Sequence, residues 1–143
     1  MATRQLGLAL VLGLGIGLVF WSNGVDAQKT KGKERPAATK YLMRGIVQPN
    51  CAGIGGLLKE AGPADDKAWD TLACHAACLN ELGHGLMDDG RCPDGVWAGA
   101  TKSLREGSAA VLAAAEKKDL EAAKAAFKTV TDACGTCHKA HKS

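Results

Sequence analysis

The sequence predicts an all-α fold, in the form of an antiparallel four-helix bundle. β-branched residues are sparse, alanine is abundant, and no stretch alternates apolar and polar residues for long, so strands are not expected. Apolar residues recur instead at helical spacing, as in Trp97, Leu104 and Val111, which lie seven positions apart. Turn signals rich in Gly, Pro and Asp separate four such segments, and short connections favour antiparallel neighbours.

The first predicted helix spans about residues 38–60 and ends at the stop signal Ala61-Gly62-Pro63. Pro49 lies within it. Because proline lacks a backbone N–H and crowds the preceding turn, we expect a kink or a local break near Ile46. The apolar residues of this helix are Leu42, Ile46, Ile54, Leu57 and Leu58.

The second predicted helix follows Asp65 and Asp66 and runs to about Leu86, since acidic residues favour the positive end of the helix dipole. Two Asp/Gly/Pro turns, at residues 88–90 and 93–95, mark the next connection. The third helix is expected over about 96–117, where it carries the seven-residue apolar seam.

The fourth predicted helix begins after Asp119, a suitable N-cap, and runs to about His141. Its apolar stripe follows a 3-4-3-4-3 spacing, so these positions are expected to face inward. They are Leu120, Ala123, Phe127, Val130, Cys134 and Cys137.

This fourth helix contains the sequence Cys134-Gly135-Thr136-Cys137-His138, the C-x-x-C-H pattern of covalent c-type haem attachment. The two thiols form thioethers to the haem vinyl groups, and the adjacent imidazole of His138 binds the iron as the proximal ligand. A redox dithiol normally sits in a βαβ setting, and a zinc site needs a second closely spaced ligand pair, which is not evident here. Haem c is therefore the expected cofactor, buried against the bundle.

The chain before the first helix is typical of an exported protein. Residues 1–27 resemble a secretory signal with a basic start, an apolar run and a small residue at the end. The run is short for a membrane span, so a membrane link is expected only if this signal is not cleaved. Residues 28–37 are predicted to be a flexible basic leader, and 38–143 a single bundle domain. The expected location is periplasmic or otherwise exported, and the net charge of +3 gives no indication of nucleic-acid binding.

A helical bundle with C-x-x-C-H in its last helix resembles the class II cytochromes c, which include cytochrome c′ and its low-spin, methionine-ligated relatives. The likeness is clearest from Trp97 through Asp119-Leu120 to the haem motif. It implies a distal position in the first helix, where Met43 would provide a sixth iron ligand or an apolar blocker. Two departures are His141 and Lys142, which stand where the family commonly has an aromatic residue and Arg. His141 is expected to be a surface or haem-edge residue.

The sixth iron ligand decides the function that the resemblance implies. With Met43 as ligand, the protein is expected to be a one-electron carrier rather than an enzyme, with other redox proteins as partners. With Ile46 or Val47 there instead, the iron would be five-coordinate and would bind NO or CO. His75, His84 and Met87 are the remaining candidates for the distal position. The family also pairs through its first two helices, so a homodimer through Ile54, Leu57 and Leu58 is an alternative to a core role for these residues.

Four further cysteines remain outside the motif. In an exported protein an even number favours disulfide bonds, and we expect Cys51 with Cys74 and Cys78 with Cys92 among three connectivities. The argument for Cys51 with Cys74 is that both lie about a dozen residues from the turn between the first two helices. A metal site of Cys74, His75 and Cys78 is a competing interpretation that lacks a fourth ligand.

Overall fold

The computed structural model describes residues 37–59, 61–88 and 90–142. Within these residues the chain is helical and contains no strand, which confirms the all-α prediction. The predicted signal, residues 1–27, and nearly all of the predicted leader lie outside the described residues. Among the residues that are described, no helix has both the length and the apolar character needed to span a membrane.

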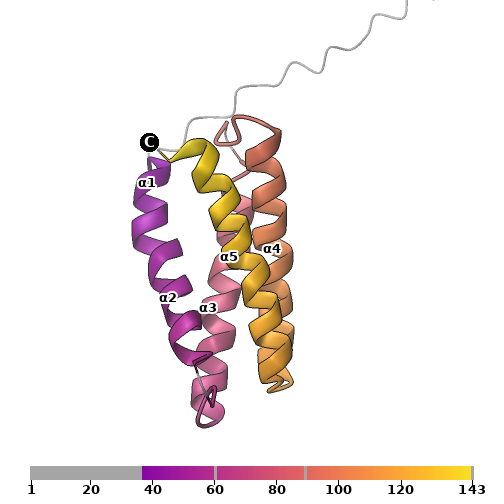
Figure 1. Ribbon diagram of the computed structural model, residues 1–143. Helices are drawn as coiled ribbons and strands as arrows, with labels where there is room; N and C mark the ends of the chain where they lie inside the picture. The colour runs from indigo at the N-terminus through magenta and orange to yellow at the C-terminus, as the bar shows by residue number, and fades with distance from the viewer. Residues whose placement is uncertain (1–36, 60, 89, 143) are drawn as a thin grey trace, which may run out of the picture.

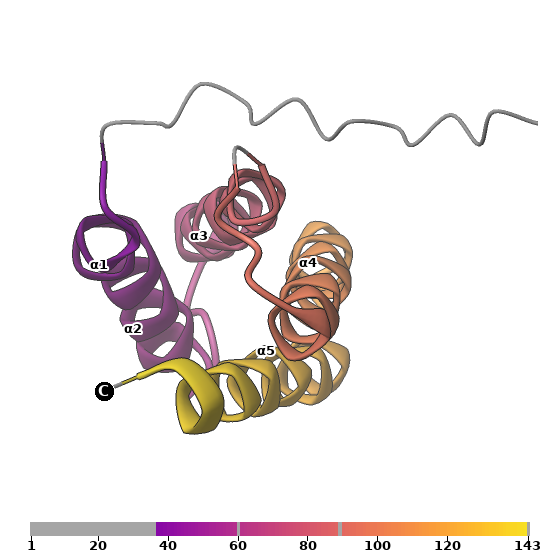
Figure 2. The ribbon, with the colours of Figure 1, turned by 90° about the horizontal axis from the view of Figure 1, so that it is seen from above.

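In the described residues, four helical segments pack side by side as a bundle in which consecutive segments run in opposite directions (Figures 1 and 2). The C-terminal end of the last segment therefore lies at the same end of the bundle as the start of the first (Figure 1). The first segment consists of α1 (Thr39–Leu42), η1 (Met43–Val47) and α2 (Gln48–Leu57). The other three are α3 (Asp66–Gly85), α4 (Gly95–Glu116) and α5 (Leu120–His141).

Aspartate side chains set the starts of the three long helices. Asp65, Asp94 and Asp119 each accept a hydrogen bond from the backbone N–H three residues later, which satisfies a donor that the helix leaves unpaired. The observed bounds of α3, α4 and α5 consequently agree with the sequence prediction to within a residue or two.

The irregularity expected around Pro49 is present as a π-helical turn, η1, just before it. Pro49 cannot donate a backbone hydrogen bond, and the widened turn removes the need for that bond. The side chain of Asn50 supports the turn, since its Nδ2 donates to the carbonyl oxygen of Ile46 at 2.7 Å. The first segment thus continues through Pro49 without breaking.

The core follows the predicted apolar faces. The seam residues Trp97, Leu104 and Val111 are all buried. Ile54 and Leu58 are also buried in the core, which supports the core interpretation of these two residues over an exposed pairing face. The other large buried side chains are Val47, Leu72, Leu79, Leu86 and Val130.

The first segment is positioned by close contact with α3. A Cβ atom on Gly53 would overlap the imidazole ring of His75, so α2 approaches α3 more closely than any other residue at position 53 allows. The Nδ1 atom of the same ring lies 2.8 Å from Oδ1 of Asn50, in a hydrogen bond between α2 and α3. Together with the bond from Asn50 to Ile46, this contact links η1 to α3.

Candidate functional site

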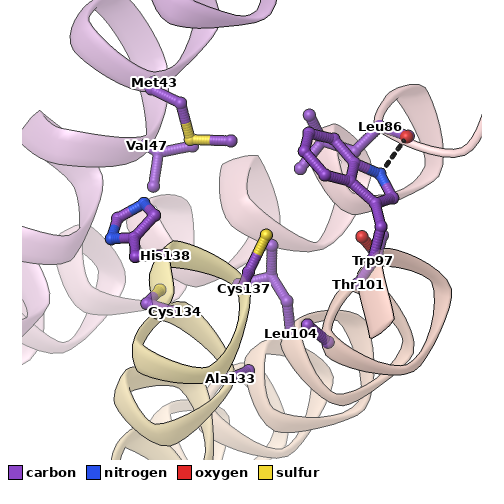
Figure 3. Close-up of a pocket in the computed structure, with 11 residues that line it drawn as sticks. Met43, Val47, Leu86, Trp97, Thr101, Leu104, Ala133, Cys134, Cys137 and His138 are labelled. Atoms are coloured by element: carbon purple, nitrogen blue, oxygen red, sulfur yellow. Dashed lines mark hydrogen bonds between the residues drawn. The ribbon is translucent and has the colours of Figure 1, made fainter. Parts of the chain in front are cut away.

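A cavity of about 30 Å³ lies between the first segment, α4 and α5, near the end of the bundle that contains the C-terminus. Figure 3 shows its lining, which is mostly apolar and comes from helices that are distant in the sequence. The lining residues are Met43, Val47, Leu86, Trp97, Ala100, Thr101, Leu104, Ala133, Cys134, Cys137 and His138.

The helix α5 contributes the three residues of the predicted haem motif that carry chemistry. Cys134, Cys137 and His138 are one helical turn apart or less, so all three reach the same cavity (Figure 3). The two cysteines are half-buried, whereas His138 is exposed overall although it also lines the cavity. The expectation that both cysteines face inward is therefore confirmed.

The opposite wall is formed by η1, which presents Met43 and Val47 (Figure 3). The side chain of Met43 extends from this wall toward the space above His138 and Cys137. Ile46, an alternative distal residue on sequence grounds, points elsewhere, because it lines a separate groove between the first segment and α3. Met43 and Val47 therefore remain candidates for the distal position, and Ile46 does not.

None of the other three distal candidates lines the cavity. His75 is engaged by Asn50 between α2 and α3. His84 lies on the exposed face of α3, and Met87 packs on the core outside the cavity lining.

Trp97 connects the cavity to the start of α4. Its indole Nε1–H donates to the carbonyl oxygen of Leu86 at 2.8 Å, in a buried hydrogen bond drawn in Figure 3. On another side the ring meets His141 edge-on, with ring centroids 5.4 Å apart. His141 also lies 3.4 Å from a carboxylate oxygen of Asp94. His141 therefore joins the end of α5 to the start of α4, and its side chain, only 19% exposed, is less accessible than a surface residue.

The pKa of the Asp94 carboxyl is lowered, mainly by the hydrogen bond from the backbone N–H of Trp97 and further by the proximity of His141. This carboxylate is the N-cap of α4, so its charged form stabilises the helix that carries one wall of the cavity.

A third thiol lies beside the cavity. The side chain of Cys51, from α2, forms a hydrogen bond with that of Cys134. This bond is the main cause that lowers the pKa of the Cys134 thiol to about 7, against the opposing effect of burial. The same interaction, together with burial, raises the pKa of Cys51. Burial and the neighbouring Cys134 raise the pKa of Cys137. Cys134 is accordingly the most readily ionised of the three thiols.

All six cysteines of the described residues are free thiols, so the predicted Cys51–Cys74 and Cys78–Cys92 disulfides are not present in the structure. For Cys51 the reason is geometric. The contact between Asn50 and His75 shows that the level of Cys51 along α3 was predicted correctly to within one residue. The side chain of Cys51, however, faces α5 and not α3. Cys74 and Cys78 are exposed on α3, and Cys92 is half-buried with its thiol 3.4 Å from the carbonyl oxygen of Asp94.

The competing metal site on α3 is also not formed. His75 is turned toward α2, and the described residues contain no group of three or more His, Cys, Asp and Glu side chains arranged to hold a metal ion.

Sequence reasoning missed Asn50, and it paired Cys51 with Cys74 instead of placing it beside the haem motif. Asn50 fixes η1 through contacts to Ile46 and His75, and Cys51 meets a thiol of the haem motif. An amide side chain directly after Pro49 was one available signal, because the carbonyl groups next to a mid-helix proline need a donor from elsewhere.

The donor set of the cavity fits a covalently attached haem. One wall offers two thiols and an imidazole, the facing wall offers a thioether, and the surrounding side chains are apolar. A volume of about 30 Å³ holds only one or two water molecules. The cavity therefore has to widen to accommodate a haem. This combination of a helical bundle and a C-x-x-C-H helix lining an apolar cavity defines a c-type haem protein.

A family comparison agrees with this class. Residues 95–142, which comprise α4, the connecting turn and α5, match the family model described as Cytochrome C′, a family of class II cytochromes c. The resemblance inferred from the sequence is confirmed over this part of the chain. Because proteins of this family bind covalently attached haem c, haem c is the cofactor. No curated protein and no solved structure matches the chain.

Proposed function

We propose that the protein is an exported one-electron carrier whose haem is attached through Cys134 and Cys137, with His138 and Met43 as the two axial ligands of the iron. The supporting observation is that these four side chains, from two separate parts of the chain, line one cavity. The bound haem supplies the Fe(III)/Fe(II) couple, and the chain positions, ligates and shields it.

The proposal for Met43 rests on its position and on its chemistry. Among the described methionines, Met43 lines the cavity and Met87 does not. It is the first residue of the π-helical turn η1, and π turns within helices are frequent at functional sites. A thioether at the sixth position raises the reduction potential and favours electron transfer over ligand binding.

The apolar lining supports a role in electron transfer. Val47, Leu86, Leu104 and Ala100 keep water from the haem face, and Thr101 is the single polar residue of the lining apart from the proposed ligand and tethers. Such a site is suited to holding the iron in two oxidation states without offering a general acid or base for substrate chemistry. We therefore propose redox proteins as partners and no enzymatic activity.

A second candidate function is a five-coordinate haem protein that binds NO or CO. It is favoured by Val47, which lies beside Met43 on the same wall and would leave an apolar distal face if the thioether does not bind. The two functions differ only in the occupant of the sixth position.

The deciding experiment is the absorption spectrum of the ferric and ferrous protein, with and without CO, after production with a c-type maturation system. We expect low-spin spectra, a ferric methionine-to-iron charge-transfer band, and slow CO binding. Met43→Ala should abolish the band and open the iron to CO. Met87→Ala is the matched control and should leave both properties unchanged.

Three outcomes contradict parts of the proposal. A high-spin wild-type spectrum that shifts at once with CO favours the gas-binding function. A low-spin spectrum unaffected by Met43→Ala means that another group binds the iron. If the wild-type protein releases its haem under denaturing conditions, Cys134 and Cys137 are not haem tethers.

A further inference from the structure

We infer that Cys51 and Cys134 form a redox-sensitive disulfide site in the haem-free chain, and that this disulfide competes with haem attachment. The inference rests on the proposed function, because it takes Cys134 to be one of the two haem tethers. It concerns Cys51, a residue outside the C-x-x-C-H motif.

The two thiols belong to helices on opposite sides of the cavity. Cys51 is on α2, one turn after η1, and Cys134 is on α5. Both side chains pack against the same hydrophobic core cluster, and they interact with each other. Both thiols are half-buried, so they are shielded in part yet still reachable from solvent.

A separate contact confirms that this face of α2 lies along α5. A Cβ atom built on Gly55, one helical turn after Cys51, would lie 3.5 Å from the ring of Phe127. Phe127 is on the same stripe of α5 as Cys134, two turns earlier. The two helices therefore run antiparallel on this face, and Gly55 with Phe127 forms a second point of close approach beside the thiol pair.

The chemistry of the step is an ordinary thiol–disulfide exchange with a disulfide oxidant, such as oxidised glutathione or an exported dithiol oxidase. The thiolate of Cys134 attacks a sulfur of the oxidant and releases one thiol. The thiol of Cys51 loses its proton, attacks the mixed disulfide at Cys134 and releases the second thiol. Two protein thiols thus give up two electrons and two protons, and the oxidant's disulfide is reduced to two thiols.

The disulfide has two consequences for haem attachment. It removes the Cys134 thiol that must add to a haem vinyl group. It also ties the first segment to α5 across a cavity of about 30 Å³, which is too small for a haem unless it widens. Reduction of Cys51–Cys134 is therefore required before the haem is attached.

The first test maps disulfides in the full chain produced without haem maturation. The chain is equilibrated with oxidised glutathione, free thiols are blocked, and non-reduced peptides are identified by mass spectrometry. We expect a Cys51–Cys134 cross-link that is lost in Cys51→Ser and retained in Cys92→Ser, which removes another half-buried thiol. A cross-link of Cys134 to Cys137 alone, or no cross-link to Cys51, overturns the inference.

The second test measures covalent haem on denaturing gels after production with a maturation system, in media supplemented with cystine or with a reducing thiol. Cystine should cause a loss of haem-bearing protein in the wild type and in Cys92→Ser, and a smaller loss in Cys51→Ser. Equal losses in all three proteins overturn the competition. Absence of covalent haem in every medium contradicts the proposed function instead, while the peptide map still decides whether Cys51 pairs with Cys134.

Discussion

The hydrogen bond from Trp97 to the carbonyl oxygen of Leu86 offers a direct test of how the cavity wall is stabilised. The substitution Trp97→Phe keeps an aromatic side chain at a position that is 8% exposed, but it removes the indole N–H. The Leu86 carbonyl then remains buried without its donor. Leaving a buried acceptor unpaired costs about 1–3 kcal/mol, so we expect the free energy of unfolding to fall by about that amount.

The assay is urea unfolding of the haem-bearing protein followed by far-ultraviolet circular dichroism. For a domain of this size each 1 kcal/mol corresponds to a shift of roughly 4–8 °C in Tm, so thermal unfolding provides a second readout. Tyr41→Phe is the control, because it removes a hydroxyl from a ring that is 60% exposed. If Trp97→Phe loses no more stability than this control, the bond to Leu86 does not stabilise the wall and our reasoning is refuted.

Two further predictions concern contacts at the edges of the site. Gly53→Ala should lower the free energy of unfolding by about 1–3 kcal/mol in urea titrations, because the added Cβ overlaps the His75 ring and overpacking costs that much; an unchanged midpoint would mean that α2 and α3 separate freely. The pKa of Asp94 is lowered in the folded state, so its stabilising effect is complete above the unfolded pKa and is lost as pH falls through the folded value. Asp94→Asn should therefore show a weaker loss of stability than the wild type as pH falls below the ordinary value of 3.8, measured as urea midpoints against pH; parallel curves would contradict this sign.

The helix bounds were predictable because their causes are local. An Asp side chain that caps a helix bonds to a backbone N–H three residues later, and a Gly-Pro stop acts on its own turn. These signals are readable in one dimension, and the observed helices begin within a residue or so of where the aspartates place them. The haem motif was predictable for the same reason, since its three reactive residues lie within one turn and a half of α5.

The neighbouring helix that each side chain of α2 faces was not predictable in this way. Counting residues from a turn gives the axial level of Cys51 correctly, but it does not tell which neighbour that side chain faces. The π-helical turn at 43–47 adds to the difficulty, because a widened turn changes the angular position of the residues on one side of it relative to those on the other. The contact of Asn50 with His75 spans 25 positions and has no local signal beyond the neighbouring proline.

The two sides of the proposed iron site, α5 and the first segment, differ in how much apolar surface they bury. His138 and the cysteines stand on α5, a long helix whose residues Ala123, Val130 and Ala133 are buried. Met43 stands on a segment in which α1 buries no residue and η1 buries only Val47. The part of the segment around Met43 is also held by polar contacts, namely Asn50 with His75 and Arg91 with the carbonyl oxygen of Ala37 at 2.7 Å. Because few buried apolar contacts mean a low cost of local opening, we expect the wall bearing Met43 to open more readily than the wall formed by α5.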